Sequence, residues 1–475
     1  MVPTMSFIWF CWLVLGIPFQ LGSLIEAFTA PLSFQSPSSS HGARKSSIPL
    51  LAEFTTSPES PSSSIDLEKL GVEARSRGEL DAAVSYLEAA VLKDPSNAVA
   101  HLNLGMVLKK QRRLAAAIGS LQSALCMFEE RGDHDLLDEA EFQLGLTLTE
   151  MGYVEDAIGS FSKLLAKELN QKGLARAKIM LANVLLDGRG EKTRSKEIYL
   201  DACKANPASP MHVLAGCIFD SEGNHEAAKY HYKTAWETSK GADHEAALHL
   251  SMSYTRDGSE EEKAMLPQLR SRFPDFIRSS ADYVVSQFAE GMPPSAHYFT
   301  YDMLHLAMDN VSLKKGLVLE FGVFHGKTIR MIAEKFPTSQ IHGFDTFSGI
   351  PENWHNTKKG SYSTHNALPV APDNTKYHVG LFSDTLPSFL DQNKGEPIRF
   401  VNIDCDLYSS TKDIFDLISD RVVSGTIIIF DEYVMNPHWM DDEYKAFQEA
   451  VERNGWQYEY LGISLLSMQA IVRIL

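Results

Sequence analysis

Apolar residues recur along residues 65–275 in a pattern typical of paired amphipathic helices. Leu70-Gly71 is followed by Ala83 and Leu87, and Leu104-Gly105 begins the same pattern 34 residues later. Further units begin at Leu144-Gly145, Leu181-Ala182 and Ala215-Gly216, and a weaker sixth runs from Leu250 to about Pro274. Small residues let two helices approach, and large ones fill the space between neighbouring repeats. Because such a unit cannot bury its apolar face alone, we expect an α-solenoid over residues 63–275.

This pattern resembles the tetratricopeptide repeat, whose period is about 34 residues. The resemblance implies a concave surface that binds a peptide or a partner protein. The alternative is a solenoid that only positions or dimerises the domain that follows. No Cys/His spacing in the segment is typical of a metal site, so we expect His101, His212, His225 and His231 to be surface or packing residues.

Beyond about residue 295, short apolar runs alternate with helix-length segments. The runs lie at residues 317–321, 341–344, 399–403 and 426–430, and a further strand, the third in chain order, is expected just before Gly380. They predict parallel strands that are buried on both faces. Two final runs, 456–460 and 468–474, are separated by a short turn and predict an antiparallel hairpin at one edge. Residues 276–475 are therefore predicted to form a doubly wound α/β domain with a mostly parallel, seven-stranded sheet.

The first of these strands runs into a glycine-bearing turn, residues 320–328, of the kind that lets a ligand approach backbone N–H groups. A phosphate-binding P-loop needs four residues between its glycine and Gly-Lys-Thr, but only three separate Gly322 from Gly326. A dinucleotide-binding turn needs a second glycine where Phe324 stands. The sequence has an acid, Glu320, before the turn and a second acid, Asp345, at the end of the next predicted strand. This arrangement resembles the nucleoside-binding turn of class I S-adenosylmethionine-dependent methyltransferases. There Asp345 would accept hydrogen bonds from both ribose hydroxyls.

Four blocks of sequence resemble the macrocin O-methyltransferase family: residues 319–326, 343–354, 402–411 and 430–433. The resemblance covers about residues 295–475. It implies transfer of a methyl group from S-adenosylmethionine to a hydroxyl, typically on a sugar of a natural product, with a divalent cation that is usually Mg²⁺. It also implies cofactor contacts by Glu320, Gly322, Phe324, Gly326, Thr328, Asp345, Phe382 and Asp384. Of these, Phe382 and Asp384 would lie beside the adenine, and the alternative for Phe382 is a place in the core.

Acidic residues follow two of the predicted strands. Asp404 and Asp406 follow the fourth strand, and Asp431 and Glu432 follow the fifth. Because the carboxyl ends of parallel strands share an edge, these carboxylates would converge and repel one another without a cation. Hard oxygen donors favour Mg²⁺. By family resemblance we expect Asp404, Asp431 and Glu432 to be metal ligands, Asp404 also to be the general base, and Asp406 to hold the loop. The alternative is that these acids are caps and solvated strand ends.

Residues 352–378 form a polar stretch that is long for a loop and is typical of an active-site lid. Within it, His355 or His365 is a candidate for assisting proton transfer, and the alternative is a solvent-exposed histidine. We expect Trp439 and Glu443 to begin a helix that shapes the acceptor pocket.

The N-terminal apolar run, residues 7–19, is shorter than the roughly 20 residues of a membrane span and matches a signal-peptide core. Residues 27–52 contain no acid and many Ser and Pro, which is typical of a transit peptide. The junction Glu26-Ala27-Phe28 resembles the alanine–phenylalanine motif of bipartite plastid presequences in diatoms and related algae. We therefore expect a signal peptide at 1–27, a transit peptide or linker at 28–62, and delivery to a plastid through the secretory route. The alternatives are a secreted or lumenal protein and an uncleaved anchor.

Composition narrows the function classes. With 44 basic and 61 acidic residues the net charge is −17, which argues against nucleic-acid binding. Five cysteines form no disulfide framework, and no stable membrane span is expected in the mature chain. Two hypotheses remain: an O-methyltransferase that acts on a small-molecule hydroxyl, with a protein partner on its repeats, or a scaffold with an inactive or cofactor-sensing methyltransferase domain. The combination of Glu320, Asp345, Asp404 and Asp431 favours the enzyme.

Overall fold

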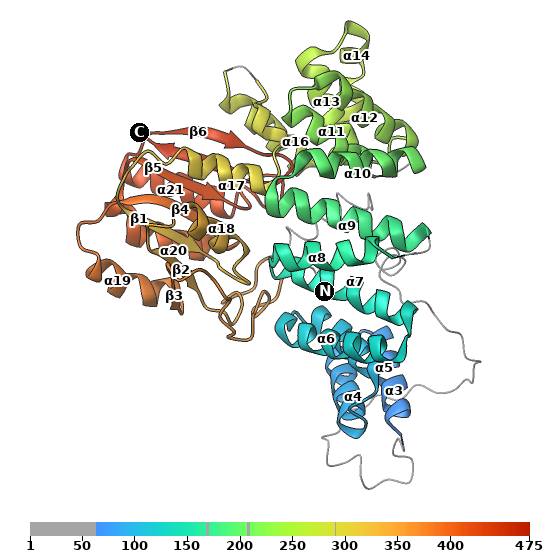
Figure 1. The fold of residues 1–475 in the computed structure, drawn as a ribbon. Helices are drawn as coiled ribbons and strands as arrows, with labels where there is room; N and C mark the ends of the chain where they lie inside the picture. Colours follow the sequence, from blue (N-terminus) through green and yellow to red (C-terminus); the bar gives the residue numbers. More distant parts are fainter. Residues whose placement is uncertain (1–62, 168–170, 207–209, 290) are drawn as a thin grey trace. The chain divides into compact units, whose positions relative to one another are not determined.

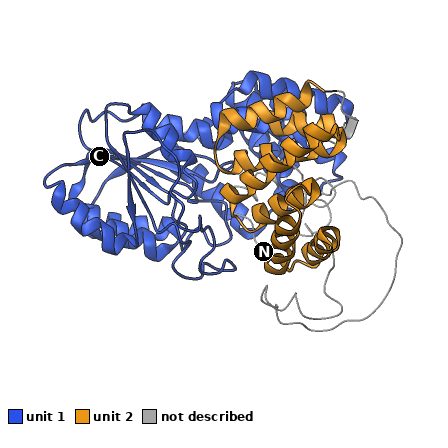
Figure 2. Cartoon of the chain, turned by 60° about the horizontal axis from the view of Figure 1, so that its bottom comes forward, with its two compact units in different colours: residues 1–16, 182–475 blue, residues 17–181 orange. Residues whose placement is uncertain are grey.

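The computed structural model describes residues 63–167, 171–206, 210–289 and 291–475. The presequence predicted for residues 1–62 lies outside them. Among the described residues, one compact unit comprises residues up to 181 and the other begins at residue 182 (Figure 2). In this part of the chain, no helix is both long enough and apolar enough to cross a membrane.

The first unit consists of paired helices (Figure 1). They are α3 (Ser64–Ser76), α4 (Leu80–Lys93), α5 (Ala98–Lys110), α6 (Leu114–Arg131), α7 (His134–Glu150), α8 (Val154–Leu165) and the first part of α9 (Gln171–Arg189). Within each pair a glycine of the first helix faces a large side chain of the second. A Cβ at Gly71 would lie 2.6 Å from Leu87, and one at Gly145 would lie 2.8 Å from Phe161. Leu87 also shares a core with Leu104 of the next pair, as the repeat pattern predicts.

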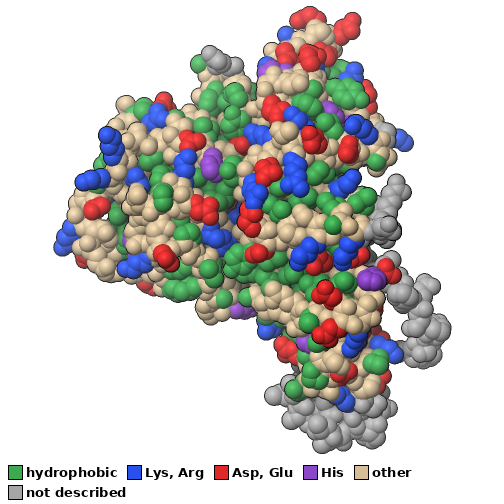
Figure 3. Space-filling view, viewed as in Figure 1, with side chains coloured by type: hydrophobic (Ala, Val, Ile, Leu, Met, Phe, Trp, Pro, Cys, Tyr) green, Lys and Arg blue, Asp and Glu red, His purple; other side chains and the backbone are tan. Residues whose placement is uncertain are grey.

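The second unit begins with further helices of the same kind. They are the end of α9, then α10 (Lys192–Ala205), α11 (Met211–Ser221), α12 (His225–Thr238), α13 (His244–Asp257), α14 (Glu260–Ala264), α15 (Leu266–Arg270) and α16 (Asp275–Gln287). The weak sixth repeat corresponds to one full helix, α13, followed by the two short helices α14 and α15. On the face drawn in Figure 3 acidic and basic side chains are interspersed, and acids gather over α14.

A seven-stranded sheet completes the second unit (Figure 1). Its strands are β1 (Leu317–Phe321), β2 (Ile341–Asp345), β3 (Thr375–Val379), β4 (Ile398–Ile403), β5 (Val422–Phe430), β6 (Tyr458–Ile463) and β7 (Ala470–Ile474), in the order β3-β2-β1-β4-β5-β7-β6. Strands β1 to β5 are parallel, and β7 pairs antiparallel with both β5 and β6. The predicted fold class, a helical solenoid followed by a doubly wound α/β domain, is confirmed.

Helices accompany the sheet, and the sheet interior is apolar. The helices are η2 (Pro294–His297), α17 (Thr300–Asp309), α18 (Lys327–Lys335), α19 (Phe382–Gln392), α20 (Tyr408–Ile418), η3 (Ser419–Arg421) and α21 (Glu443–Asn454). Every residue of β1 and β4 is buried, because both strands lie inside the sheet and are covered on both faces. The strand order reverses at β1, so the carboxyl ends of β1 and β4 border the crevice where ligands bind in open α/β sheets.

Helix α16 packs on the α/β domain within this second unit. The backbone N–H of Met435 donates to Ser280 at 2.8 Å, and the indole of Trp439 donates to Ser279 at 3.1 Å. The Tyr283 and Tyr460 hydroxyls are 2.6 Å apart. Trp439 was expected to begin a helix, but α21 begins only at residue 443, and Trp439 precedes it with its ring against α16.

Candidate functional site

The turn after β1 depends on a glycine. Gly322 has φ +87°, and a Cβ there would overlap the carbonyl oxygen of Asp404. Any side chain at this position would therefore push apart the segments that follow β1 and β4. The close approach brings the turn against the acids that follow β4.

Asp345, at the end of β2, holds this turn together. Its Oδ2 accepts hydrogen bonds from the backbone N–H groups of Val323 and Phe324, both at 2.8 Å. Its Oδ1 accepts one from the N–H of Phe347 at 2.7 Å. Phe324 and Phe347 have φ values of +49° and +54°, so the carboxylate stabilises two residues in the left-handed region. Oδ2 thus accepts two hydrogen bonds and Oδ1 one, so only Oδ1 retains a second lone pair, and ribose binding by Asp345 stays a prediction.

A cavity of about 280 Å³ opens beside this turn. It is lined by seven of the residues predicted to bind cofactor or metal: Gly322, Phe324, Asp345, Phe382, Asp404, Asp431 and Glu432. Backbone and side chains of α19 and α20 and the segment 349–352 complete the lining. The structure thus brings the second acid, the turn and the metal candidates to one place.

Four other predicted cofactor residues lie outside that lining: Glu320, Gly326, Thr328 and Asp384. Gly326 caps the N-terminus of α18 with φ +77°, and Asp384 lies in the first turn of α19. The Glu320 carboxylate accepts hydrogen bonds from the Thr328 hydroxyl and, at 2.9 Å, from the Asn402 amide. It therefore links β1 to α18 and β4, and burial raises its pKa to about 8.

The acids that follow β4 and β5 form one cluster. Asp404, Asp406 and Asp431 are half-buried, and Glu432 is buried. Burial raises the pKa of Asp404 and of Glu432 well above their ordinary values, and the neighbouring carboxylates raise them further. Burial likewise raises the pKa of Asp406 to about 7 and of Asp431 to about 6. Such a cluster is costly as a set of anions, because burial and mutual repulsion both disfavour the charged forms.

The cluster has the donor set for a hard divalent cation. Among the described residues, Oε2 of Glu432 is buried and has no hydrogen-bond partner. Asp431 accepts a hydrogen bond from Gln469 at 2.7 Å through Oδ1, which fixes the orientation of its carboxylate. Carboxylate oxygens are the ligands that Mg²⁺ takes in proteins, so these residues fit the metal that the sequence predicts.

Two further acids belong to the site. Asp406 was expected only to hold its loop, but it lines the cavity, with φ +62°. Glu443, expected only to help shape the acceptor pocket, is fully buried behind Glu432, whose backbone N–H donates to it at 3.3 Å. The Asp-x-Asp spacing was a signal for Asp406. For Glu443 no pattern in the sequence indicated contact with the other acids, because it lies at the start of a helix 11 residues beyond Glu432.

The predicted lid segment folds against this edge of the sheet. Ile350 and Trp354 form a small apolar core with Leu407. The Trp354 indole donates to Asp442 at 3.2 Å, and His355 contacts the same carboxylate at 2.9 Å. His355 is thus tied to Asp442 outside the cavity lining, and His365 is exposed.

The comparisons with known proteins agree with the two parts of the fold. A family model described as a methyltransferase domain matches residues 319–433, and one described as a tetratricopeptide repeat matches residues 68–134. No curated protein matches the chain. The chain therefore carries tetratricopeptide repeats followed by a methyltransferase domain.

Several solved structures resemble parts of the chain. The calicheamicin methyltransferase CalS11 is 22% identical, with 45% of this chain and 93% of that chain covered and a TM-score of 0.31. YrrB, a tetratricopeptide repeat protein with an unusual peptide-binding site, is 20% identical, with 40% and 92% covered and a TM-score of 0.33. PilF of Pseudomonas aeruginosa is 19% identical, with 45% and 92% covered and a TM-score of 0.37.

Proposed function

We propose that the chain is an S-adenosylmethionine-dependent O-methyltransferase that acts on a hydroxyl of a sugar-containing or other small molecule with the help of a divalent cation. The observation that carries this proposal is the convergence of Asp404, Asp406, Asp431 and Glu432 on one cavity beside the Gly322 turn. A divalent cation would offset the repulsion among these four acids, whose charged forms burial and mutual proximity disfavour.

The cavity offers places for both reactants. The turn at Gly322 and Phe324 lines the cavity and would contact a nucleoside, and Phe382 at the start of α19 would pack against the adenine ring. S-adenosylmethionine supplies, when bound, an electrophilic methyl group on a sulfonium. Asp404, Asp431 and Glu432 would hold the divalent cation, which makes a coordinated hydroxyl more acidic.

In this proposal Asp404 is the general base. The family resemblance gives it this role, and its place in the cavity lining would put it within reach of an acceptor hydroxyl. It takes the proton of the acceptor hydroxyl while the hydroxyl oxygen bonds to the methyl carbon and the carbon–sulfur bond breaks. The remaining carboxylates position the acceptor and balance charge.

Asp404→Asn tests this assignment. The amide keeps the shape of the side chain but can neither take a proton nor bind a cation as strongly, so methyl transfer should fall by at least about 100-fold. The thermal unfolding midpoint should not fall, because the amide removes one of several mutually repelling buried carboxylates. The matched control is Asp391→Asn on the exposed face of α19, which should keep full activity.

Calorimetric titration with S-adenosylmethionine, with and without Mg²⁺, separates the enzyme from a scaffold with an inactive domain. Absence of binding under both conditions would overturn the enzyme proposal. Transfer of a labelled methyl group into a fractionated extract then distinguishes a small-molecule acceptor from a protein delivered by the repeats.

A further inference from the structure

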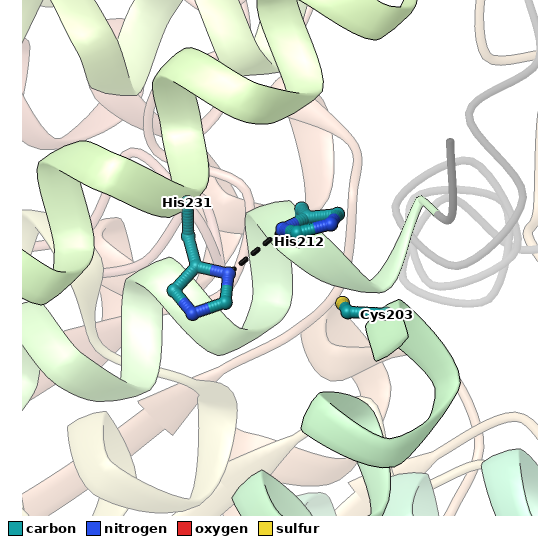
Figure 4. A group of neighbouring side chains, drawn as sticks. All are labelled: Cys203, His212 and His231. Atoms are coloured by element: carbon teal, nitrogen blue, oxygen red, sulfur yellow. Dashed lines mark hydrogen bonds between the residues drawn. The ribbon is translucent and has the colours of Figure 1, made fainter. Parts of the chain in front are cut away.

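Three buried side chains with metal-binding atoms meet where α10 packs on the next helix pair (Figure 4). They are Cys203 near the end of α10, His212 in the first turn of α11 and His231 in α12. Their exposed fractions are 5%, 4% and 7%, and one ligand atom of each lies within 4.8 Å of the others. The two ring Nδ1 atoms are 2.8 Å apart. One thiol and two imidazoles thus share a space the size of a coordination sphere.

The repeat fold itself does not require these residue types. Cys203 stands four positions after the large residue Tyr199, and His212 stands four positions before Gly216. In the other repeats, the positions equivalent to Cys203 are occupied by Val91, Leu125, Leu165 and Trp236. The positions equivalent to His212 are occupied by Leu67, His101, Glu141 and Lys178. The positions equivalent to His231 are occupied by Tyr86, Ser120, Ser160 and Ile198. At each junction between two successive repeats, the first position comes from one repeat and the other two from the next. Among these junctions, only the one between the fourth and fifth repeats has a metal-binding side chain at all three positions. General packing therefore does not account for the set.

The two rings are buried, and each offers a ring nitrogen to the shared space. Nε2 of His212 is buried and has no hydrogen-bond partner among the described residues. Phe219 stacks on His231 with 5.5 Å between ring centroids, which fixes the plane of that ring. The two rings are thus buried and oriented, and the hydrogen bonding of His212 is incomplete.

A second cluster in the same unit gives a contrast. Cys217 lies 3.7 Å from Nε2 of His249, and Nδ1 of His249 lies 3.1 Å from Nδ1 of His297. The fully buried carboxylate of Asp220 also approaches His297, at 3.4 Å, and accepts a hydrogen bond from the hydroxyl of Tyr232. Both nitrogens of each histidine in this second cluster face polar partners, so hydrogen bonding alone explains it.

We propose that Cys203, His212 and His231 bind one zinc-type divalent ion that fastens the fourth repeat to the fifth. A thiolate and two imidazoles suit a borderline-soft ion and not Mg²⁺, and three protein ligands leave the fourth tetrahedral position to water. The thiol proton passes to solvent when the metal–sulfur bond forms, so about one proton is released for each ion bound. Two nitrogens on a tetrahedral zinc lie about 3.3 Å apart, so the Nδ1 atoms need to separate only slightly.

Cobalt(II) titration of the metal-stripped full-length chain tests the site. A thiolate ligand gives a strong charge-transfer absorption in the near ultraviolet, whereas cobalt that is held by carboxylates alone gives none. We expect this absorption to saturate at one ion per chain. Cys203→Ser should abolish it, and His231→Gln should weaken binding by more than about 100-fold, because each change removes a direct ligand.

Cys217→Ser is the matched control, because it removes the equivalent thiol of the second cluster and should leave the absorption intact. A wild-type chain without thiolate-to-cobalt absorption would overturn the proposal, as would absorption that survives in Cys203→Ser and disappears in Cys217→Ser. If Cys203→Ser does not fold, the test rests on His231→Gln. An affinity for cobalt that is unchanged in His231→Gln would exclude the proposed site. Zinc should also raise the thermal unfolding midpoint of the wild type and of Cys217→Ser more than that of folded Cys203→Ser or His231→Gln.

Discussion

Two acids at the ends of neighbouring strands have opposite environments. Asp345 accepts hydrogen bonds from three backbone N–H groups, so both of its oxygens have partners. Glu320 has two side-chain donors, and its Oε2 is buried with no partner among the described residues. At the scale of the residue, burial with incomplete hydrogen bonding thus favours the protonated form of Glu320.

Glu320→Gln should change how stability depends on pH. The pKa of Glu320 is raised to about 8 in the folded chain from 4.5, so the stability that this shift contributes is fully present only below pH 4.5. That contribution is lost as pH rises from 4.5 to about 8, on the order of 1–4 kcal/mol. The amide cannot ionise, so the variant should gain stability relative to the wild type across this window. Chemical denaturation between pH 5 and about 9 measures the difference.

Glu396→Gln, at an exposed carboxylate beyond α19, is the control for that series. Its free energy of unfolding should stay parallel to that of the wild type at every pH. A constant offset for Glu320→Gln, with no dependence on pH, would show that Glu320 is ionised in the fold.

At the scale of the element, local pattern predicted most of the structure. The apolar runs gave strands β1, β2 and β4 to within about one residue, since a strand buried on both faces must be apolar throughout. Strand β5 begins at Val422, four residues earlier than predicted, because Val422 pairs with Ile398 around an irregularity in the ladder. The first residue of β5 is therefore set by pairing with its neighbour strand, and the local sequence pattern does not predict it. The packing of a small residue against a large one within each repeat was also predictable from the sequence, because the same spacing recurs in successive repeats.

Gly145→Ala and Gly159→Ala should have opposite effects on the stability of the repeats. Gly145 in α7 faces Phe161, and a Cβ there would lie 2.8 Å from the ring, so alanine should destabilise the chain by about 1–3 kcal/mol. Gly159 in α8 has no heavy atom within 4 Å of such a Cβ. Alanine there should stabilise the helix by about 0.5–1 kcal/mol, because glycine loses more backbone entropy on folding. Thermal unfolding measures both, and an equal response would refute the packing assigned to Gly145.

At the scale of the whole molecule, the last repeats and the α/β domain share one compact unit. Lys327 at the start of α18 pairs with Asp187 of α9, and Tyr301 of α17 fills the space over Gly190. The boundary predicted at residue 276 stays a prediction, but these contacts cross it. Asp220 is the centre of one such connection, since its carboxylate joins Arg256 of α13 to His297 of η2.

Asp220→Asn should therefore destabilise the second unit by about 2 kcal/mol or more, because it leaves Arg256 without its buried counter-charge. Differential scanning calorimetry of the full-length chain gives the effect. Asp201→Asn, at an exposed position of α10, serves as the matched control and should shift the unfolding midpoint little. Equal midpoints for the two variants would contradict a structural role for the Asp220 network.

The candidate site was only partly predictable. Asp404, Asp431 and Glu432 follow apolar runs, so their shared edge follows from the parallel sheet. Glu443 joins them from a later helix, and Asp406 enters the cavity through a left-handed backbone conformation. The Asp-x-Asp spacing was a signal for Asp406 but not for Glu443, whose place depends on how a distant segment packs.

By itself the sequence determined the order of a repeat solenoid and an α/β domain, the strands, and the edge of the sheet where the acids lie. These properties follow from hydrophobic periodicity and from the direction of parallel strands, which are local or topological. Only the tertiary structure decided that Cys203, His212 and His231 meet, that Glu320 is enclosed, and that the last repeats pack with the sheet. These depend on distances between residues far apart in the chain, which close packing sets and no local pattern encodes.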